Sequence, residues 1–233
     1  RFSEVAQAKE HLLIMNEFFA NLETKLDCKV DFKLPILRKF FSIEEQNNWF
    51  LACDKVNLAP FLSTNLISKK YSSIDSPFGY GEVLQTGYVD TALLLNLYRA
   101  YLLKNKLFIE ESFDYTLLKE ESNGIRYKDI QARNIVFAEG FGMHANPYFN
   151  NLPLDGTKGE LFIIKAPNLD VDVIMNTSVF ILPLGDSLYK VGATYNWIDK
   201  TDIPTEEGKT ELIEKIKEII NCDFEIMEHF AGV

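Results

Sequence analysis

Cysteine is scarce in this sequence, and the few thiols stand far apart. The cysteines are Cys28, Cys53 and Cys222, an odd number, and no C-x-x-C pair occurs. Structural zinc sites are usually built from such pairs, and a disulfide framework needs an even set of cysteines. We therefore expect no metal bound by protein side chains, and reduced thiols in a cytoplasmic protein.

Positive charge is also in short supply. The chain has 24 Lys and Arg against 34 Asp and Glu, which gives a formal net charge of −10. Nucleic-acid partners require a clustered basic face, and anionic membrane surfaces attract basic segments, so the charge argues against both. No apolar run approaches the roughly 18 uncharged residues that a transmembrane helix needs, so we expect no membrane span.

The common catalytic motifs are missing as well. His11, His144 and His229 do not form an H-E-x-x-H pattern, and the sequence has no G-x-S-x-G elbow and no P-loop. The loop residue His144 is better explained as a surface or structural histidine. Residues 78–81 (Phe-Gly-Tyr-Gly) only approximate a G-x-G-x-x-G fingerprint, because no βαβ unit follows them. The many Phe and Tyr residues favour an aromatic core over a cofactor box.

Apolar residues at helical spacing predict helices at four places along the chain. Ser3 and Ser42 can cap the first two, and Asp90 or Thr91 the third, while Pro204 and Thr205 precede the last. The expected ranges are 3–26, 43–53, 91–105 and a final helix with apolar positions from Leu212 to Ile220. The third helix should bury a stripe made of Leu93, Leu94, Leu97, Tyr98, Tyr101 and Leu102.

Alternating and apolar runs predict the strands. The Asn123-Gly124 pair accepts positive φ and predicts a hairpin, and the Gly185-Asp186-Ser187 turn predicts a hairpin from 179–184 and 188–195. Residues 134–138 are typical of a buried strand in a parallel sheet. Further strands are expected over 81–88, 107–109, 113–119, 125–128, 159–165 and 224–230. The pattern predicts an α+β chain with a large mixed β-sheet and flanking helices, which cannot cover both faces of that sheet.

Several short segments follow one another in a distinctive order. They are Asp90–Leu94, the Asn123-Gly124 turn, Ile135–Gly140, Lys158–Leu161, Phe180–Leu184, Val191–Tyr195 and Ala231–Val233. This order, over roughly residues 80–233, resembles the D-amino-acid oxidase, glycine oxidase and sarcosine oxidase superfamily of FAD-dependent oxidoreductases.

The resemblance implies a chain that passes back and forth between two domains. Residues 1–88 and 141–228 would form the substrate domain, and residues 89–140 the middle segment of a Rossmann-like FAD-binding domain that is incomplete here. Residues 229–233 would begin the return to the FAD domain. The family's glycine-rich turn for the pyrophosphate is absent, and its Gly-x-Arg-Pro arginine would fall just after Val233. We therefore expect an inactive internal fragment.

The resemblance also assigns residues to the cofactor, FAD. Ala138, Glu139 and Gly140 match a strand end that passes close to the flavin, where small residues permit close approach of the backbone. Phe113 matches a position at the adenine end of FAD.

Other matched positions belong to the substrate. Tyr195 matches a residue that faces the substrate over the flavin ring. Phe180 stands where the family usually has Tyr, and Leu184 where it often has Arg. These two departures weaken the case for a simple amino-acid carboxylate at this spot.

The implied activity is oxidation of a C–N bond in a small-molecule amine or amino acid, by hydride transfer to FAD. The protein would mainly position the substrate and exclude water, which agrees with the lack of acid–base motifs. The alternative is a non-catalytic binding or interaction domain that kept the sheet and lost the chemistry. A tRNA-modifying oxidase module is disfavoured by the net charge of −10.

Overall fold

The computed structural model describes residues 7–68 and 70–233 of the chain. Its helices are α1 (Ala8–Leu26), α2 (Ile43–Cys53), α3 (Thr91–Lys104) and α4 (Glu206–Lys217), with 3-10 turns η1 (Tyr115–Leu117) and η2 (Gly140–Ala145). Its strands are β1 (Asp31–Lys33), β2 (Ile36–Lys39), β3 (Tyr80–Val83), β4 (Gly87–Val89), β5 (Leu118–Glu121), β6 (Gly124–Tyr127), β7 (Ile130–Ala132), β8 (Gly159–Lys165), β9 (Ile174–Asn176), β10 (Phe180–Gly185), β11 (Leu188–Gly192) and β12 (Glu225–Gly232). The expected cap Ser3 lies outside the described residues.

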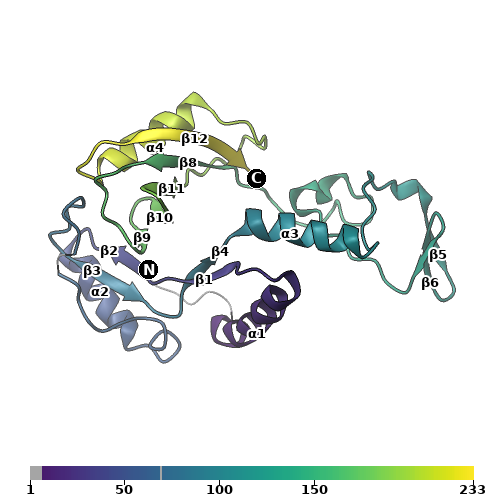
Figure 1. The fold of residues 1–233 in the computed structure, drawn as a ribbon, viewed down its shortest axis with the longest axis horizontal. Coiled ribbons are helices and arrows are strands. Elements are labelled where there is room, and N and C mark those ends of the chain that lie inside the picture. Colours follow the sequence, from purple (N-terminus) through teal and green to yellow (C-terminus); the bar gives the residue numbers. More distant parts are fainter. Residues whose placement is uncertain (1–6, 69) are drawn as a thin grey trace.

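A seven-stranded sheet forms the main body of the molecule, with strand order β12-β8-β11-β10-β9-β2-β3 (Figure 1). Strands β2 and β9 run parallel, and the other neighbours are antiparallel. The predicted large mixed sheet with flanking helices is therefore confirmed. The predicted hairpin is also confirmed, since Phe180 pairs with Gly192 across β10 and β11. Strand β11 ends at Gly192, before the predicted end at Tyr195.

One face of this sheet is buried against α4. Phe162, Ile164 and Val191 on the strands are fully buried, as are Leu212 and Ile216 on the helix. Each such side chain contributes about 1.5–3 kcal/mol when it is removed from water. The alternate residues of the same strands are only half-buried, because successive side chains of a strand point to opposite faces. We call this second side of the sheet the half-buried face.

Helix α2 covers the β3 end of the sheet. Ser42 caps it by accepting a hydrogen bond from the backbone N–H of Glu45 (3.1 Å), as the sequence predicts. Trp49 is buried, and its indole N–H donates to the carbonyl of Ser63 (3.0 Å). A Cβ on Gly81 would lie 2.5 Å from the Trp49 ring, so the helix and the strand make contact where the strand has no side chain.

The expected strand over 81–88 is wrong in one respect, because it is two strands in two sheets. Strand β3 pairs with β2, whereas β4 pairs with β1 in a separate two-stranded sheet. The chain turns between them at Gln85, whose φ is +58°. A residue in the left-handed region interrupts an extended run, and this position carries no glycine to reveal it in the sequence.

Residues 91–145, which we call the arm, extend away from the main sheet (Figure 1). The arm begins with α3, whose expected cap is confirmed, since the Asp90 carboxylate accepts from the backbone N–H of Leu93 (3.0 Å). The expected burial of the α3 stripe is wrong, because no residue of this helix is buried. The helix packs beside α1, and this contact covers too little of its surface to bury the stripe.

Three expected strands in the arm are also wrong. Residues 107–109 form no strand, and residues 113–119 contain the turn η1 before β5 begins at Leu118. Residues 134–138 form no strand either, and Val136 is 86% exposed. An extended segment becomes a strand only when a neighbour pairs with its backbone groups, and none of the described residues does so here.

The hairpin of the arm is confirmed. Strands β5 and β6 pair antiparallel, with Glu121 opposite Gly124, and β7 completes a three-stranded sheet. The turn lies at Ser122 and Asn123, one residue earlier than expected. Gly124, with φ of +142°, opens the return strand.

Candidate functional site

Phe113, assigned to the adenine end of the cofactor, belongs to an aromatic cluster in the arm. Its ring stacks on Tyr127 with centroids 4.3 Å apart, and meets the edges of Phe137 (5.6 Å) and Tyr115 (5.4 Å). Beside it is a pocket of about 300 Å³ with mostly apolar walls. The walls include Ile109, Phe113, Ile125, Tyr127, Ile130 and Ile135. Such a pocket can receive a flat ring between apolar side chains.

The segment Ala138-Glu139-Gly140 lies next to this cluster. The Tyr115 hydroxyl donates to one carboxylate oxygen of Glu139, and the Asn146 amide donates to the other (2.7 Å). The bond to Glu139 raises the pKa of Tyr115, because losing the shared proton would place two negative charges together. The structure thus brings Phe113 and residues 138–140 together through Tyr115. The sequence analysis missed Tyr115 and Asn146, which carry no motif.

Gly140 is the backbone position with the most open surroundings in this segment. Its φ is +55°, and a Cβ built on it would meet no atom within 4 Å. The protein therefore leaves room for a ligand to approach the backbone there, as the resemblance implies. Glu139 places a negative charge beside that approach, however, so it does not favour a diphosphate.

The expected substrate residues lie on the main sheet, and they do not all lie together. Phe180 pairs with Gly192, only three residues before Tyr195 in the chain. Leu184 lies at the other end of β10, near the turn, about 13 Å along the strand from Phe180 at about 3.3 Å per residue. The structure therefore separates Leu184 from Phe180 along β10, while Tyr195, which is 75% exposed, follows the end of β11 beside the start of β10.

The half-buried face carries cations that the sequence analysis missed, and one of them, Lys165, lies exposed at the end of β8. Lys190 on β11 lies opposite Leu182 and Ile163 of the neighbouring strands. Arg38 on β2 lies opposite Asn176 of β9. The period-2 alternation of the strands is the signal that could have found them, because it assigns each residue to one face.

Arg38 is neutralised by its neighbours. Its guanidinium forms an ion pair with Glu45, in which Nε lies 3.1 Å from Oε1. It also donates to the Asn176 side chain (2.7 Å) and to the carbonyl of Thr177 (3.1 Å). Arg38 therefore joins β2, α2 and β9, and few of its donors remain for a ligand.

A cavity of about 1170 Å³ lies beside Arg38, between α2 and the β2–β3 edge of the sheet. Apolar and polar side chains both line it. The lining includes Ile36, Arg38, Glu45, Asn48, Trp49, Leu58, Val83 and Asn176.

A buried charge network lies on the opposite, α4 side of the sheet. Lys158, whose side chain is 1% exposed, donates to Asp199 (2.5 Å) and lies 3.8 Å from Glu160. Glu160 accepts from the hydroxyl of Thr205 (2.7 Å) and lies 2.8 Å from Nε2 of His229. Burial acts to raise the pKa of Glu160, but the bonds from Thr205 and His229 outweigh it and hold that pKa below its usual value.

The described residues include neither a membrane-spanning helix nor a cluster of metal-ligating side chains. No helix in residues 7–68 or 70–233 is long and apolar enough to span a membrane. Within the same residues, no three His, Cys, Asp or Glu side chains are grouped so that they could hold a metal ion.

No protein-family model matches the chain, but solved structures resemble it closely in fold. A glycine oxidase from Bacillus cereus ATCC 14579 superposes on 98% of this chain and 70% of its own, with a TM-score of 0.76 and 16% identity. A glycine oxidase from Geobacillus kaustophilus matches 99% of this chain and 68% of its own, with a TM-score of 0.73 and 13% identity. An L-α-glycerophosphate oxidase from Mycoplasma pneumoniae with FAD bound matches 87% of this chain and 61% of its own, with a TM-score of 0.66 and 15% identity. The chain therefore has the fold of these oxidases, as the resemblance of its sequence led us to expect.

Proposed function

We propose that this chain is part of an FAD-dependent oxidoreductase that oxidises a C–N bond of a small amine or amino acid. The observation that carries the proposal is the fold, which overlaps a glycine oxidase over 98% of the chain. The M. pneumoniae oxidase carries FAD in the same fold. Its name refers to a glycerophosphate, so the C–N bond is the finer part of the proposal and depends on the two glycine oxidases.

In this proposal the chain contributes to two domains, as the resemblance implies. Residues 1–88 and 141–228 supply the substrate domain, and residues 89–140 supply a middle segment of the FAD domain, to which residues 229–233 begin the return. Two observations support this division. The arm extends from the main sheet (Figure 1), and the seven-stranded sheet is made only of strands from outside residues 89–140.

The arm contains residues that suit some parts of FAD, namely a ring system and a group that lies close to the backbone. The apolar pocket beside Phe113 suits a ring system, and the open backbone at Gly140 suits a close approach. When bound, FAD supplies the electron acceptor that takes a hydride from the carbon beside the amine. Phe180 and Tyr195 would position that carbon and exclude water from it, with Leu184 at a greater distance on the same strand as Phe180.

We also propose that residues 1–233 alone do not retain FAD. A flavin diphosphate is normally held at a helix N-terminus after a glycine-rich turn, where free N–H groups and the helix dipole meet its charge. The sequence contains no G-x-G-x-x-G, and the segment beside the expected flavin carries the anionic Glu139.

The test compares residues 1–233 with the longest native chain that contains them, each purified in the presence of added FAD. We expect flavin absorbance in the longer chain only, and loss of its colour when amines or amino acids are added without oxygen. Stoichiometric FAD on residues 1–233 would refute the argument about the missing turn. A longer chain without FAD would refute the proposed function.

Tyr195→Ala in the longer chain tests the substrate assignment. We expect turnover to fall by about 100-fold, the cost of a misplaced reacting carbon, with the flavin content unchanged. The matched control is Trp197→Ala, which removes an aromatic ring of similar exposure (62%) two residues away. Equal effects of the two substitutions would contradict the assignment of Tyr195.

A second candidate is a binding domain that has this fold without the chemistry. The observation in its favour is the apolar character of two expected carboxylate-binding positions, Phe180 and Leu184. A protein that holds FAD and binds amines, yet never loses its flavin colour with them, would establish this candidate.

A further inference from the structure

We propose that Lys190 is the residue that selects the substrate, by receiving a carboxylate that is attached to an apolar body. This inference deepens the proposed function and rests on it, since it assumes that the half-buried face of the sheet is the substrate side. Lys190 would act as a positioning residue through its charge.

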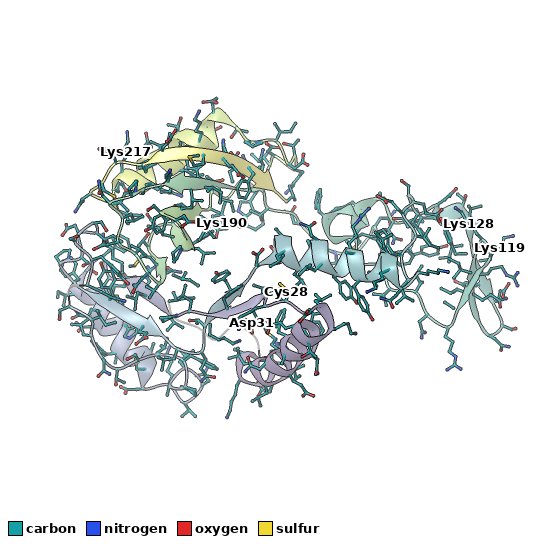
Figure 2. The ribbon with its side chains drawn as sticks, viewed as in Figure 1. Cys28, Asp31, Lys119, Lys128, Lys190 and Lys217 are labelled. Carbon is teal, nitrogen blue, oxygen red and sulfur yellow. The ribbon has the colours of Figure 1, made fainter. Side chains whose placement is uncertain are left out.

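The position of Lys190 follows from strand register. Its neighbours in sequence, Tyr189 and Val191, are buried on the α4 side, so Lys190 points to the half-buried face. Figure 2 shows its side chain there, whereas Lys217 of α4 lies on the other side of the sheet. Gly192, two residues further along β11, lies opposite Phe180. Lys190 is therefore a diagonal neighbour of Phe180, within reach of one small ligand.

The nearest cross-strand neighbours of Lys190 are apolar, and the closest carboxylate in its row is Glu228, one strand further on, opposite Ile163. Leu182 and Ile163 lie directly across from it on the two adjacent strands, at the roughly 5 Å that separates cross-strand Cβ atoms. Its Nζ lies 5.7 Å from the centre of the Phe230 ring. A half-buried ammonium among such side chains is partly removed from water, which strengthens its attraction for an anion.

The charge of Lys190 has no counter-ion in the described part of the chain. The ion pairs formed there involve other cations, and the Lys190 ammonium lies beside the Phe230 ring instead. Arg38, a second cation of this face, is already paired with Glu45, and Lys165 lies exposed at the end of β8. In a chain of net charge −10, an uncompensated cation between apolar residues is a specific attraction for a negative group.

The chemistry of these neighbours defines the class of ligand. A lysine offers one compact charge with three donors, which can balance a single carboxylate. Leu182, Ile163, Phe180 and Phe230 would contact an apolar body, and they offer no side-chain donors for the second charge of a phosphate. An apolar carboxylic acid, such as an amino acid with a hydrocarbon side chain, fits both features.

The test uses benzoate as the probe and benzamide as its uncharged counterpart, with binding to the FAD-loaded native chain measured by calorimetry. We expect Lys190→Met to weaken benzoate binding by about 10–100-fold, the range for a hydrogen bond to a charged group, and to leave benzamide binding unchanged. Lys190→Arg should restore benzoate binding to within about threefold, because it keeps the charge. The control is Lys217→Met, which removes an exposed lysine from the opposite side of the sheet and should change neither affinity.

The inference is wrong if the wild-type protein does not bind benzoate, or if Lys190→Met binds it as the wild type does. It is also wrong if benzamide binding falls in parallel, since a packing defect would then explain the loss. Flavin bleaching by amines, recorded separately, reports on the proposed function alone. If amines bleach the flavin but benzoate binding does not depend on Lys190, only the inference is refuted. If benzoate binding depends on Lys190 but no amine bleaches the flavin, only the proposed reaction is refuted.

Discussion

Lys158→Met should destabilise the protein by about 3 kcal/mol. The lysine is 1% exposed, so its methylenes are packed and methionine conserves their volume, but the substitution leaves Asp199 and Glu160 without their cation. Removing one partner of a buried ion pair costs about 3–5 kcal/mol. We expect the lower end, because Asp199 is 29% exposed and can regain water, and Glu160 keeps its bonds from Thr205.

The free energy of unfolding is measured by urea titration, with tryptophan fluorescence and circular dichroism as independent probes. In a chain of this size, about 3 kcal/mol corresponds to a melting temperature lower by about 6–12 °C. The matched control is Lys209→Met on α4, whose pair with Glu206 is long (3.7 Å) and exposed, so it should cost at most about 1 kcal/mol. Equal losses in the two variants would refute the reasoning from burial.

Two further substitutions test the packing and the charges around the main sheet. The pKa of Glu160 is lowered, so its charged form stabilises the folded protein above about pH 4.3, and this stabilisation is lost as the pH falls through the lowered pKa. Glu160→Gln should therefore be less stable than the wild type at pH 7, and it should lose less stability between about pH 5 and 3. Acid titrations of the two proteins measure both differences. Gly81→Ala should cost about 1–3 kcal/mol by overpacking, because the new Cβ would lie 2.5 Å from the buried Trp49 ring. The control is Gly232→Ala, whose Cβ would meet no atom within 4 Å, and it should change the melting temperature little. Equal shifts of the melting temperature in the two glycine variants would contradict the packing argument. Parallel acid-unfolding curves for the wild type and Glu160→Gln would contradict the charge argument.

The features predicted correctly from sequence are those that neighbouring residues determine. The caps at Ser42 and Asp90 were identified because a short polar side chain needs only the next turn of backbone as its partner. Thr205, just before α4, caps that helix through the N–H of Gly208 in the same way. The β10–β11 hairpin was predicted for a similar reason, since its turn occupies consecutive positions.

The features that were wrong depend on distant partners. Residues 134–138 have the composition of a buried strand, but no described strand pairs with them and Val136 is 86% exposed. The apolar stripe of α3 has helical spacing, yet the contact with α1 leaves it no more than half-buried. In both cases the pattern identifies a segment that is able to be buried, and only tertiary contacts decide whether burial occurs.

The candidate site was predictable only where the resemblance supplied a position. Phe113 and residues 138–140 were assigned in that way, and the structure does place them together through Tyr115. Tyr115 carries no local signature, and strand alternation assigns Lys190 only to a face of the sheet, because the roles of both depend on which segments the fold brings beside them. The resemblance assigned both Phe180 and Leu184 to the substrate, and in the structure they lie at opposite ends of β10.

The arm should be the least protected part of the molecule in hydrogen exchange. Within residues 91–145, Tyr127 alone is buried, whereas β8 contains Phe162 and Ile164 at 0% exposure. Local opening needs less free energy where few apolar contacts must be broken. The amides of the arm should therefore exchange at least on the order of tenfold faster than the amides of β8. If FAD binds beside Phe113, its addition to the longest native chain should slow exchange in residues 113–140 and leave β8 unchanged. Equal protection of the arm and β8 without FAD would contradict the argument from burial, and slowing confined to the main sheet would contradict the assignment of the arm to the cofactor.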